Sequence, residues 1–378
     1  MDALTTPLPK DWEVKTFRDI STINQGLQIP ISQRLKAPTE HAKFYITIQA
    51  LNNRKEFEYI KTYNESVVCH KDDILMTRTG NTGMVITNIE GVFHNNFFKI
   101  NFDRTLINKD FLVYFLSLEQ TQKTILKKAG TSTIPDLNHN DFYSLSIPLP
   151  PLNEQIAIAN ILSDVDRYLY SLDALILKKE SVKKALSFEL LSQRKRLKGF
   201  NQAWQRVRLG DICEITTGSL DANEMVHYGK YRFYTCAKEY YFIDKYAFDT
   251  EAILISGNGA YVGYVHYYKG KFNAYQRTYV LDNFSEHIIF VKYFLTMFLQ
   301  SHIQTNRNEG NTPYIVMGTL KDFEIPLPPL DEQIAIANIL SDVDSEIISL
   351  KNKKRQFENI KKALNHDLMS AKIRVLKQ

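Results

Sequence analysis

The sequence of 378 residues contains only three cysteines, Cys69, Cys213 and Cys236, and no two of them are close together in the chain. A disulfide framework or a zinc ribbon needs closely spaced cysteines, so neither is supported. No run of about 18 apolar residues is present, so no transmembrane helix is expected. The first residues show no basic stretch followed by an apolar one, so no signal peptide is expected. These absences favour a cytoplasmic protein without a membrane segment.

Sequence motifs of common catalytic sites are also lacking. We find no GxxxxGK[ST] phosphate loop, no HExxH zinc motif, no GxSxG nucleophile elbow and no glycine-rich cofactor fingerprint. The NPPF and DPPY tetrapeptides of amino-methyltransferases are absent, and no two of the nine histidines are four residues apart. Asp72 and Asp73 are typical of a turn before a strand. The chain is therefore predicted to bind rather than to catalyse, with no cofactor or metal of its own.

A long internal repeat organises the chain. Residues 147–166 and 325–344 are identical at nineteen of twenty positions, and differ only at Asn153 and Asp331. The similarity continues downstream at the same offset, where Arg196 corresponds to Arg374. A weaker repeat upstream aligns Trp12 with Trp204. We infer four segments: globular domains at 1–152 and 199–330, and helical segments at 153–198 and 331–378.

Each helical segment is predicted to form one long helix. The IPLPPL stretch is expected to be a rigid turn that continues neither strand nor helix, and Asn153 or Asp331 is expected to cap the helix. Apolar residues then recur in steps of four and three, from Ile158 and from Ile336, which is a heptad pattern. Each helix could run for about 44 residues, or ~65 Å. Both have an acidic first half and a basic second half, which favours antiparallel pairing of the two helices and an approximate two-fold axis.

Both globular domains mix alternating apolar stretches (43–48, 251–256) with helical ones (109–128, 287–304), so we predict an α+β fold. Each has a glycine-containing stretch after an apolar one, at 74–83 and 253–263, which suits either close contact with a ligand or a plain hairpin turn. The second domain carries twelve of the 21 tyrosines at 228–279, interleaved with lysine and arginine. That pattern fits nucleic-acid contact and equally a half-buried sheet face.

The tandem layout resembles the specificity (S) subunit of Type I restriction–modification enzymes. The resemblance rests on Trp…Asp-Ile…Gly opening each half and on IPLPPL[ND]EQ leading into a long helix, and it covers essentially the whole chain. It implies two globular α+β target-recognition domains joined by a long antiparallel two-helix coiled coil with pseudo-two-fold symmetry. Each domain would read one half of a bipartite, interrupted site in double-stranded DNA.

The resemblance also implies the partners of the chain. The helices would set the spacing of the half-sites and dock two modification (methyltransferase) subunits, which hold S-adenosylmethionine. Restriction subunits would add ATP- and Mg²⁺-dependent translocation and cleavage. Arginine and asparagine are common base readers, which favours Arg78 and Asn81. The candidate DNA contacts are Arg34, Lys36, Arg78, Thr79, Asn81, Arg232, Asn258, Tyr261, Gln276 and Arg277. The candidate docking residues are Glu154, Gln155, Ile158, Glu332, Gln333 and Ile336.

Three alternatives stay open. One is a coiled-coil assembly scaffold without specific DNA binding, and the second is an enzyme whose site residues are too dispersed in the sequence to form a motif. The third is an S-like subunit of another DNA-methylation defence system, including a spare copy used for recombination. The target sequence and the spacer length cannot be read from this sequence.

The net charge of +5 lies in the predicted helices. Segments 153–198 and 331–378 carry +3 and +2, whereas the two globular domains carry +1 and −1. Because neutral domains attract phosphates weakly, we expect the chain alone to bind DNA weakly and to need partner subunits for tight binding.

Overall fold

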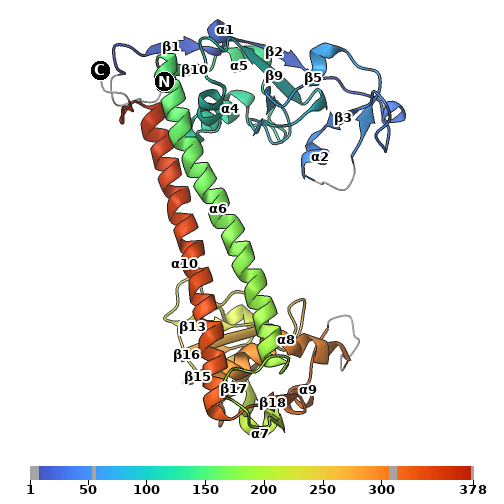
Figure 1. The fold of residues 1–378 in the computed structure, drawn as a ribbon, viewed down its shortest axis with the longest axis vertical. Helices are drawn as coiled ribbons and strands as arrows, with labels where there is room; N and C mark the ends of the chain where they lie inside the picture. Colours follow the sequence, from blue (N-terminus) through green and yellow to red (C-terminus); the bar gives the residue numbers. More distant parts are fainter. Residues whose placement is uncertain (1–7, 53–56, 306–312, 376–378) are drawn as a thin grey trace. The chain divides into compact units, whose positions relative to one another are not determined.

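The computed structural model describes residues 8–52, 57–305 and 313–375. The chain divides into two compact units (Figure 1). Unit 1 comprises residues 1–173 and 353–378, and unit 2 comprises residues 174–352. Each unit therefore holds one globular region, the first half of one long helix and the second half of the other. Among the described residues, no helix is both long enough and apolar enough to cross a membrane.

Unit 1 contains two four-stranded sheets, in the orders β2-β9-β6-β7 and β4-β3-β8-β5, and the two-stranded sheet β1-β10. Its strands are β1 (Glu13–Thr16), β2 (Ser21–Gln25), β3 (Lys43–Ile46), β4 (Tyr59–Ile60), β5 (Val68–Cys69), β6 (Ile74–Thr77), β7 (Val85–Ile86), β8 (Gly91–Phe93), β9 (Phe97–Phe102) and β10 (Ser146–Leu149). Its shorter helices are α1 (Phe17–Ile20), α2 (Ile48–Asn52), α3 (Lys109–Leu116), α4 (Glu119–Ala129) and α5 (His139–Tyr143), with 3₁₀ turns η1 (Ile31–Gln33) and η2 (Glu65–Val67).

Unit 2 contains one six-stranded sheet, in the order β12-β17-β15-β16-β13-β14, and the two-stranded sheet β11-β18. Its strands are β11 (Gln205–Arg208), β12 (Glu214–Thr217), β13 (Tyr231–Tyr234), β14 (Tyr241–Ile243), β15 (Phe248–Ser256), β16 (Val265–Ala274), β17 (Thr278–Asp282) and β18 (Glu324–Leu327). Its shorter helices are α7 (Leu209–Ile212), α8 (Ile288–Thr305) and α9 (Met317–Lys321), with the 3₁₀ turn η3 (Ala222–Glu224).

The two units follow one plan. Strands β2-β9-β6-β7 of unit 1 and β12-β17-β15-β16 of unit 2 have the same order, and every neighbouring pair is antiparallel. Next to them, β3 pairs in parallel with β8, as β13 does with β16. The long strands β15 and β16 of unit 2 are each replaced in unit 1 by two short strands. The α+β prediction and the internal duplication are therefore confirmed.

The two long helices are α6 (Leu152–Leu191) and α10 (Leu330–Met369), each of 40 residues. Inside unit 1, Asp166 pairs with Lys361 and Asp173 with Lys354, at 2.5 Å and 2.7 Å. Residue numbers rise along one helix as they fall along the other, so the halves are antiparallel, as predicted. Inside unit 2, the same direction follows from Lys179–Glu346 at 2.8 Å and from the pair of Lys183 and Asp344.

Each core joins the globular region to the start of one helix and the end of the other. In unit 1, the side chains of Ile158 and Leu162 from α6 and Leu368 from α10 are buried with Phe111 and Phe142. Unit 2 repeats this packing with residues from the opposite helix ends, Leu191, Ile336 and Leu340, against Phe290 and Leu299. The apolar seam predicted from the heptad pattern is thus buried at both ends.

Two local predictions were wrong. The IPLP residues do form strands, since β10 pairs with β1 and β18 with β11. Each is one strand of a two-stranded sheet, where a proline is tolerated because no second neighbour needs its missing N–H. The helices also begin one residue before the expected caps. The carbonyls of Pro151 and Pro329 accept the N–H of Gln155 and Gln333 at 3.0 Å, so Asn153 and Asp331 lie in the first turn.

Candidate nucleic-acid interface

A buried carboxylate near the start of each long helix binds one tryptophan and one arginine. Glu154 is 2% exposed and accepts hydrogen bonds from Trp12 Nε1 at 3.1 Å and from Arg374 at 2.7 and 2.8 Å. Glu332 is fully buried and accepts from Trp204 Nε1 at 3.1 Å and from Arg196 at 2.9 and 2.7 Å. In each unit the arginine comes from beyond the end of the other helix. We call these two groups the carboxylate clusters.

The neighbouring glutamines are also internal. Gln155 donates to the Pro150 carbonyl and Gln333 to the Pro328 carbonyl, both at 2.9 Å. Their side-chain oxygens accept the backbone N–H groups of Asn108 and His287. Both glutamines are buried, so they hold the turn before each helix against the globular region.

The predicted docking role needs correction. All six candidates are internal, at 0 to 2% exposed: Glu154, Gln155, Ile158, Glu332, Gln333 and Ile336. A side chain that is buried by its own chain has no surface to offer a partner. The near-identity of the two repeats at these positions is explained by packing within each unit.

The two glycine-containing stretches form equivalent loops. Loop 1 (residues 77–84) follows β6, and loop 2 (residues 256–264) follows β15. In loop 1, Thr77 N–H binds the Met84 carbonyl at 3.0 Å and Gly83 N–H binds the Thr77 carbonyl at 2.8 Å. Loop 2 is closed by the same two bonds, from Ser256 to Tyr264 at 3.0 Å and from Gly263 to Ser256 at 2.7 Å.

One glutamine holds each loop against a helix. Gln122 of α4 donates to the Gly83 carbonyl at 2.8 Å, and Gln300 of α8 donates to the Val262 carbonyl at 2.7 Å. The glycines are required there, because Gly83 and Gly263 have φ of +91° and +80°. A Cβ on Gly83 would lie 2.7 Å from Gln122 Oε1, and one on Gly263 would lie 2.5 Å from Ile303 Cδ1.

The far side of each loop is bound to a corresponding segment. Leu137 N–H binds the Arg78 carbonyl, and Ile315 N–H binds the Gly257 carbonyl, both at 2.9 Å. Thr79 forms an isolated antiparallel β-bridge with Asp136, and Asn258 forms one with Tyr314. Thr79 and Asn258 therefore occupy matching places in the two frames.

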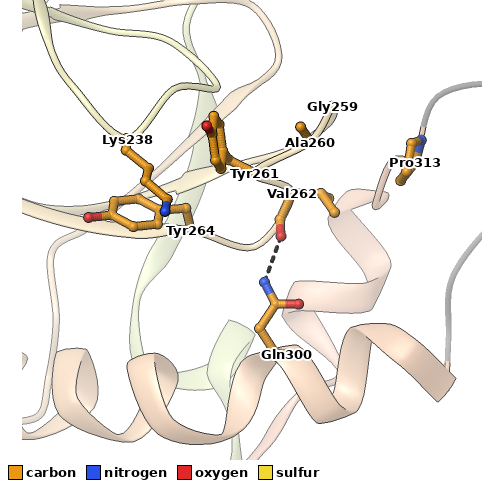
Figure 2. Close-up of a pocket in the computed structure, with 8 residues that line it drawn as sticks. All are labelled: Lys238, Gly259, Ala260, Tyr261, Val262, Tyr264, Gln300 and Pro313. Atoms are coloured by element: carbon orange, nitrogen blue, oxygen red, sulfur yellow. Dashed lines mark hydrogen bonds between the residues drawn. The ribbon is translucent and has the colours of Figure 1, made fainter. Parts of the chain in front are cut away.

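The tips of the loops differ. Loop 1 exposes Asn81, which has φ of +52°. Loop 2 is one residue longer and exposes Ala260 and Tyr261. Tyr261 borders a hollow of about 520 Å³, with the Lys238 ammonium 5.1 Å from the centroid of its ring. Figure 2 shows the Gln300 amide reaching the Val262 carbonyl, with Tyr261, Tyr264 and Lys238 among the other residues that line the hollow.

Arg78 is engaged within the chain. Its guanidinium binds Asp136 at 2.6 Å and lies 5.7 Å from the centroid of the Phe98 ring. Its side chain is only 19% exposed, and its Nε is buried without a hydrogen-bond partner. The predicted base reader is thus held against the frame of loop 1 in this structure.

The other polar candidates are placed differently from one another. Arg34 binds the Ile29 carbonyl and Glu58 and is 17% exposed, so it supports the fold of unit 1. Lys36 also binds Glu58, at 2.8 Å, but is 73% exposed. Gln276 and Arg277 are exposed on the turn before β17.

Arg232 of β13 lies between two tyrosine rings, with Cζ 4.3 Å from the centroid of Tyr240 and 4.5 Å from that of Tyr268. Its neighbour Tyr234 packs against His266, whose Nε2 donates to the Ala237 carbonyl at 2.9 Å. Burial lowers the pKa of His266, which keeps the imidazole neutral near pH 7. The tyrosine-rich stretch is therefore a partly buried sheet face that also carries exposed rings.

Three residues of this arrangement, Gln122, Asp136 and Gln300, were not predicted. Three others, Lys238, Tyr240 and Tyr264, were included only as part of the tyrosine-rich stretch 228–279. A signal for two of them exists, because Gln122 and Gln300 are separated by the offset of the main repeat, as are Pro135 and Pro313. Within the described residues, no group of three or more histidine, cysteine, aspartate or glutamate side chains could hold a metal ion.

Comparison with known proteins supplies the family context. A family model described as "Type I restriction modification DNA specificity domain" matches the chain twice, over residues 9–179 and 201–359. The chain is 38% identical over 170 residues to the Type I restriction enzyme EcoDI specificity subunit of Escherichia coli, a match that covers 44% of this chain and 37% of that protein. It is 25% identical over 415 aligned positions to the MjaVIII specificity subunit of Methanocaldococcus jannaschii, covering 97% and 94% of the two chains.

Solved structures share the fold. The S subunit of a Type I restriction–modification system from M. genitalium has a TM-score of 0.63 at 19% identity, and the match covers 96% of this chain and 98% of that one. The HsdS subunit from Thermoanaerobacter tengcongensis has a TM-score of 0.52 at 18% identity, with 97% and 99% covered.

Proposed function

Since the chain belongs to the Type I restriction–modification DNA specificity family, we propose that it is the DNA-reading subunit of such a complex. In this proposal each globular region reads one half of a bipartite, interrupted sequence in double-stranded DNA. The observation that carries it is the pairing of a common frame with different tips. Loops 1 and 2 are closed by the same hydrogen bonds, yet expose Asn81 in one unit and Tyr261 in the other.

The duplication preserves the frame of each globular region. Two units that keep one frame and change only exposed side chains can present different surfaces with the same geometry. Base recognition needs such variation, because each base pair offers its own pattern of donors and acceptors. Two different readers in one chain would recognise two different half-sites, so the target would be asymmetric.

The partner surface in this proposal lies on exposed residues that are identical in both repeats. Packing explains identity at buried positions, but it does not explain identity at exposed ones. Some of these exposed residues recur at every fourth position, which places them on one face of the helix. They are Ile156, Asn160 and Asp164 of α6 and Ile334, Asn338 and Asp342 of α10. Ile156 and Ile334 are 41% and 39% exposed although both are apolar. Two copies of one partner, the methyltransferase subunit, would dock there.

The catalytic chemistry in this proposal resides on other subunits. The methyltransferase subunits would bind S-adenosylmethionine and modify adenine, and restriction subunits would use ATP and Mg²⁺ to translocate and cleave DNA in the cytoplasm. The present chain would select the sequence. Its two globular regions have a combined formal charge of zero, so tight DNA binding would depend on the partner subunits.

Reconstitution tests the proposal. The chain and its co-encoded methyltransferase subunit are purified separately and together, and the transfer of labelled methyl groups to DNA is measured. We expect methylation only when both proteins are present. Methylation by either protein alone, or no stable complex between them, would contradict the proposal. Ile156→Lys together with Ile334→Lys should abolish assembly, whereas Tyr170→Lys, a change at an exposed aromatic of the same helix outside the identical set, should not.

A further inference from the structure

We propose that the tips of loops 1 and 2 determine the two half-sites separately, with Asn81 specifying one and Tyr261 the other, and that Gln122 and Gln300 are the residues that position them. This inference rests on the proposed function and assigns its sequence specificity to particular side chains. It follows from the correspondence of the two loops, which the strand order and the hydrogen bonds establish independently of sequence similarity.

The frame of each loop is fixed on two sides. On one side the glutamine of α4 binds the Gly83 carbonyl at 2.8 Å and that of α8 binds the Val262 carbonyl at 2.7 Å. A side chain in place of Gly83 or Gly263 would have no room there. On the other side, Leu137 or Ile315 binds the residue after the strand at 2.9 Å. A loop that is held at both sides loses little conformational freedom on binding, which favours precise contact with a ligand.

The tips are the exposed part of these frames. The side-chain amide of Asn81 offers two donors and an acceptor. Within the described residues it makes no hydrogen bond, and the bonds from Thr77 Oγ1 and Met84 N–H go to the backbone carbonyl of Asn81 instead. Such an amide can bind two positions on one adenine edge. Of the other two candidates of loop 1, Arg78 is already paired with Asp136, and Thr79 forms a β-bridge with the same residue.

Loop 2 presents a different chemistry. Tyr261 is 44% exposed beside the hollow, with Lys238 against its ring and Tyr264 at 37% exposed nearby. A phenol ring with an adjacent ammonium offers apolar contact, one hydroxyl and a positive charge. These groups suit a base edge together with the neighbouring phosphate, whereas the amide of loop 1 suits a base edge alone.

The test uses the complete complex. The chain is produced with its methyltransferase subunit, and its methylated motif is found by sequencing. Competition binding is then measured with duplexes that carry one base-pair change in either half-site. The matched variants are Asn81→Gly and Asn88→Gly, both exposed asparagines with positive φ, of +52° and +57°, which glycine tolerates. In unit 2 they are Tyr261→Ala and Tyr246→Ala, both at tyrosines that are 44% exposed.

We expect Asn81→Gly to lower discrimination roughly 5- to 150-fold at one or more positions of one half-site, and Tyr261→Ala to do so in the other half-site. Asn88→Gly and Tyr246→Ala should leave both half-sites unchanged. Gln122→Met should relax the same half-site as Asn81→Gly, and Gln300→Met the same half-site as Tyr261→Ala. A purely structural glutamine would not alter one half-site selectively. If Tyr261→Ala does not assemble, Ala260→Asp at the same exposed tip should weaken the same half-site.

The outcomes separate the two levels of the argument. Unchanged discrimination in Asn81→Gly or Tyr261→Ala, or relaxation of both half-sites by either one, overturns the assignment of the tips while leaving the proposed function intact. A control variant that shifts a half-site while the tip variant does not has the same consequence. A wild-type complex that methylates no bipartite motif overturns the proposed function and this inference with it.

Discussion

Arg374 should stabilise unit 1 and leave unit 2 unaffected, although it lies in the last few residues of the chain. Its guanidinium binds Glu154 at 2.7 and 2.8 Å and Asp11 at 2.8 and 3.3 Å. Hydrogen bonds with these carboxylates raise the pKa of Arg374, so the charge is permanent. In Arg374→Met the carboxylate of Glu154, 2% exposed, keeps only the indole N–H of Trp12.

The magnitude follows from the buried charge. Leaving one member of a fully buried ion pair without its partner typically costs about 3–5 kcal/mol. Because the arginine side chain is 27% exposed, we expect a smaller loss, about 2–3 kcal/mol. With an m-value of about 2 kcal/mol/M in urea, the unfolding midpoint of unit 1 should fall by about 1–1.5 M.

The two tryptophans provide the assay, since each unit holds one and each lies in a carboxylate cluster. In a Trp204→Phe background the fluorescence of Trp12 reports unit 1, and in a Trp12→Phe background Trp204 reports unit 2. The matched variant Arg196→Met should reverse the pattern, because Arg196 binds Glu332 in unit 2. If Arg374→Met shifts the Trp12 midpoint by less than about 0.3 M, or shifts both reporters equally, Arg374 does not stabilise unit 1 selectively.

Three other parts of the structure yield predictions of their own. Residues 1–198 alone should form a homodimer. In unit 2, Arg196 binds Glu332 and Lys183 binds Asp344. In the homodimer, Glu154 and Asp166 of the second copy would take the places of Glu332 and Asp344, and a monomer in light scattering would contradict this. A non-glycine residue with left-handed backbone dihedrals costs ~1–2 kcal/mol of stability. Gly263→Ala should lower the free energy of unfolding of unit 2 by more than this amount, because its Cβ would also crowd Ile303. Gly259→Ala, where φ is +80° and the space is open, should cost only that amount in urea unfolding. Burial holds the pKa of His266 below 6.5 in the folded state, so the unfolded chain takes up the proton more readily and the stability of unit 2 should fall as the pH drops below about 6.5. Urea midpoints at several pH values should show a weaker fall in His266→Gln, and an identical fall would argue against this histidine.

The duplication could be predicted because its signal is local and strong. Nineteen identities in twenty positions and a heptad pattern define the helices, and the opposite charges of their halves define the antiparallel pairing. The boundaries were less accurate because the first helical bond is accepted by a proline carbonyl, which has no sequence signature distinct from the turn before it.

The burial of Glu154 and Glu332 could not be predicted in the same way. A glutamate at the start of a helix usually faces water, and the arginines that neutralise these two lie 220 and 136 residues away in sequence. Only the folded chain brings them together. The interpretation of the EQ pair as a docking motif failed for this reason, and the exposed neighbour Ile156 was overlooked.

The glycine-containing stretches of loops 1 and 2 were paired from the sequence, but their residue-by-residue register was not. Unit 1 has pairs of short strands where unit 2 has the long strands β15 and β16. A sequence alignment of the two globular regions therefore loses the correct register between the few residues that they share. Hydrogen bonds that close each loop restore the register, and they identify Asn81 and Tyr261 as the tips.

If two different readers share one duplicated scaffold, methylome sequencing of cells that express this chain with its methyltransferase subunit should show methylated adenines in one bipartite motif. Its two half-sites should be unlike and separated by a fixed number of unspecified bases. A continuous motif, a palindrome with identical half-sites, or no new methylation would contradict this.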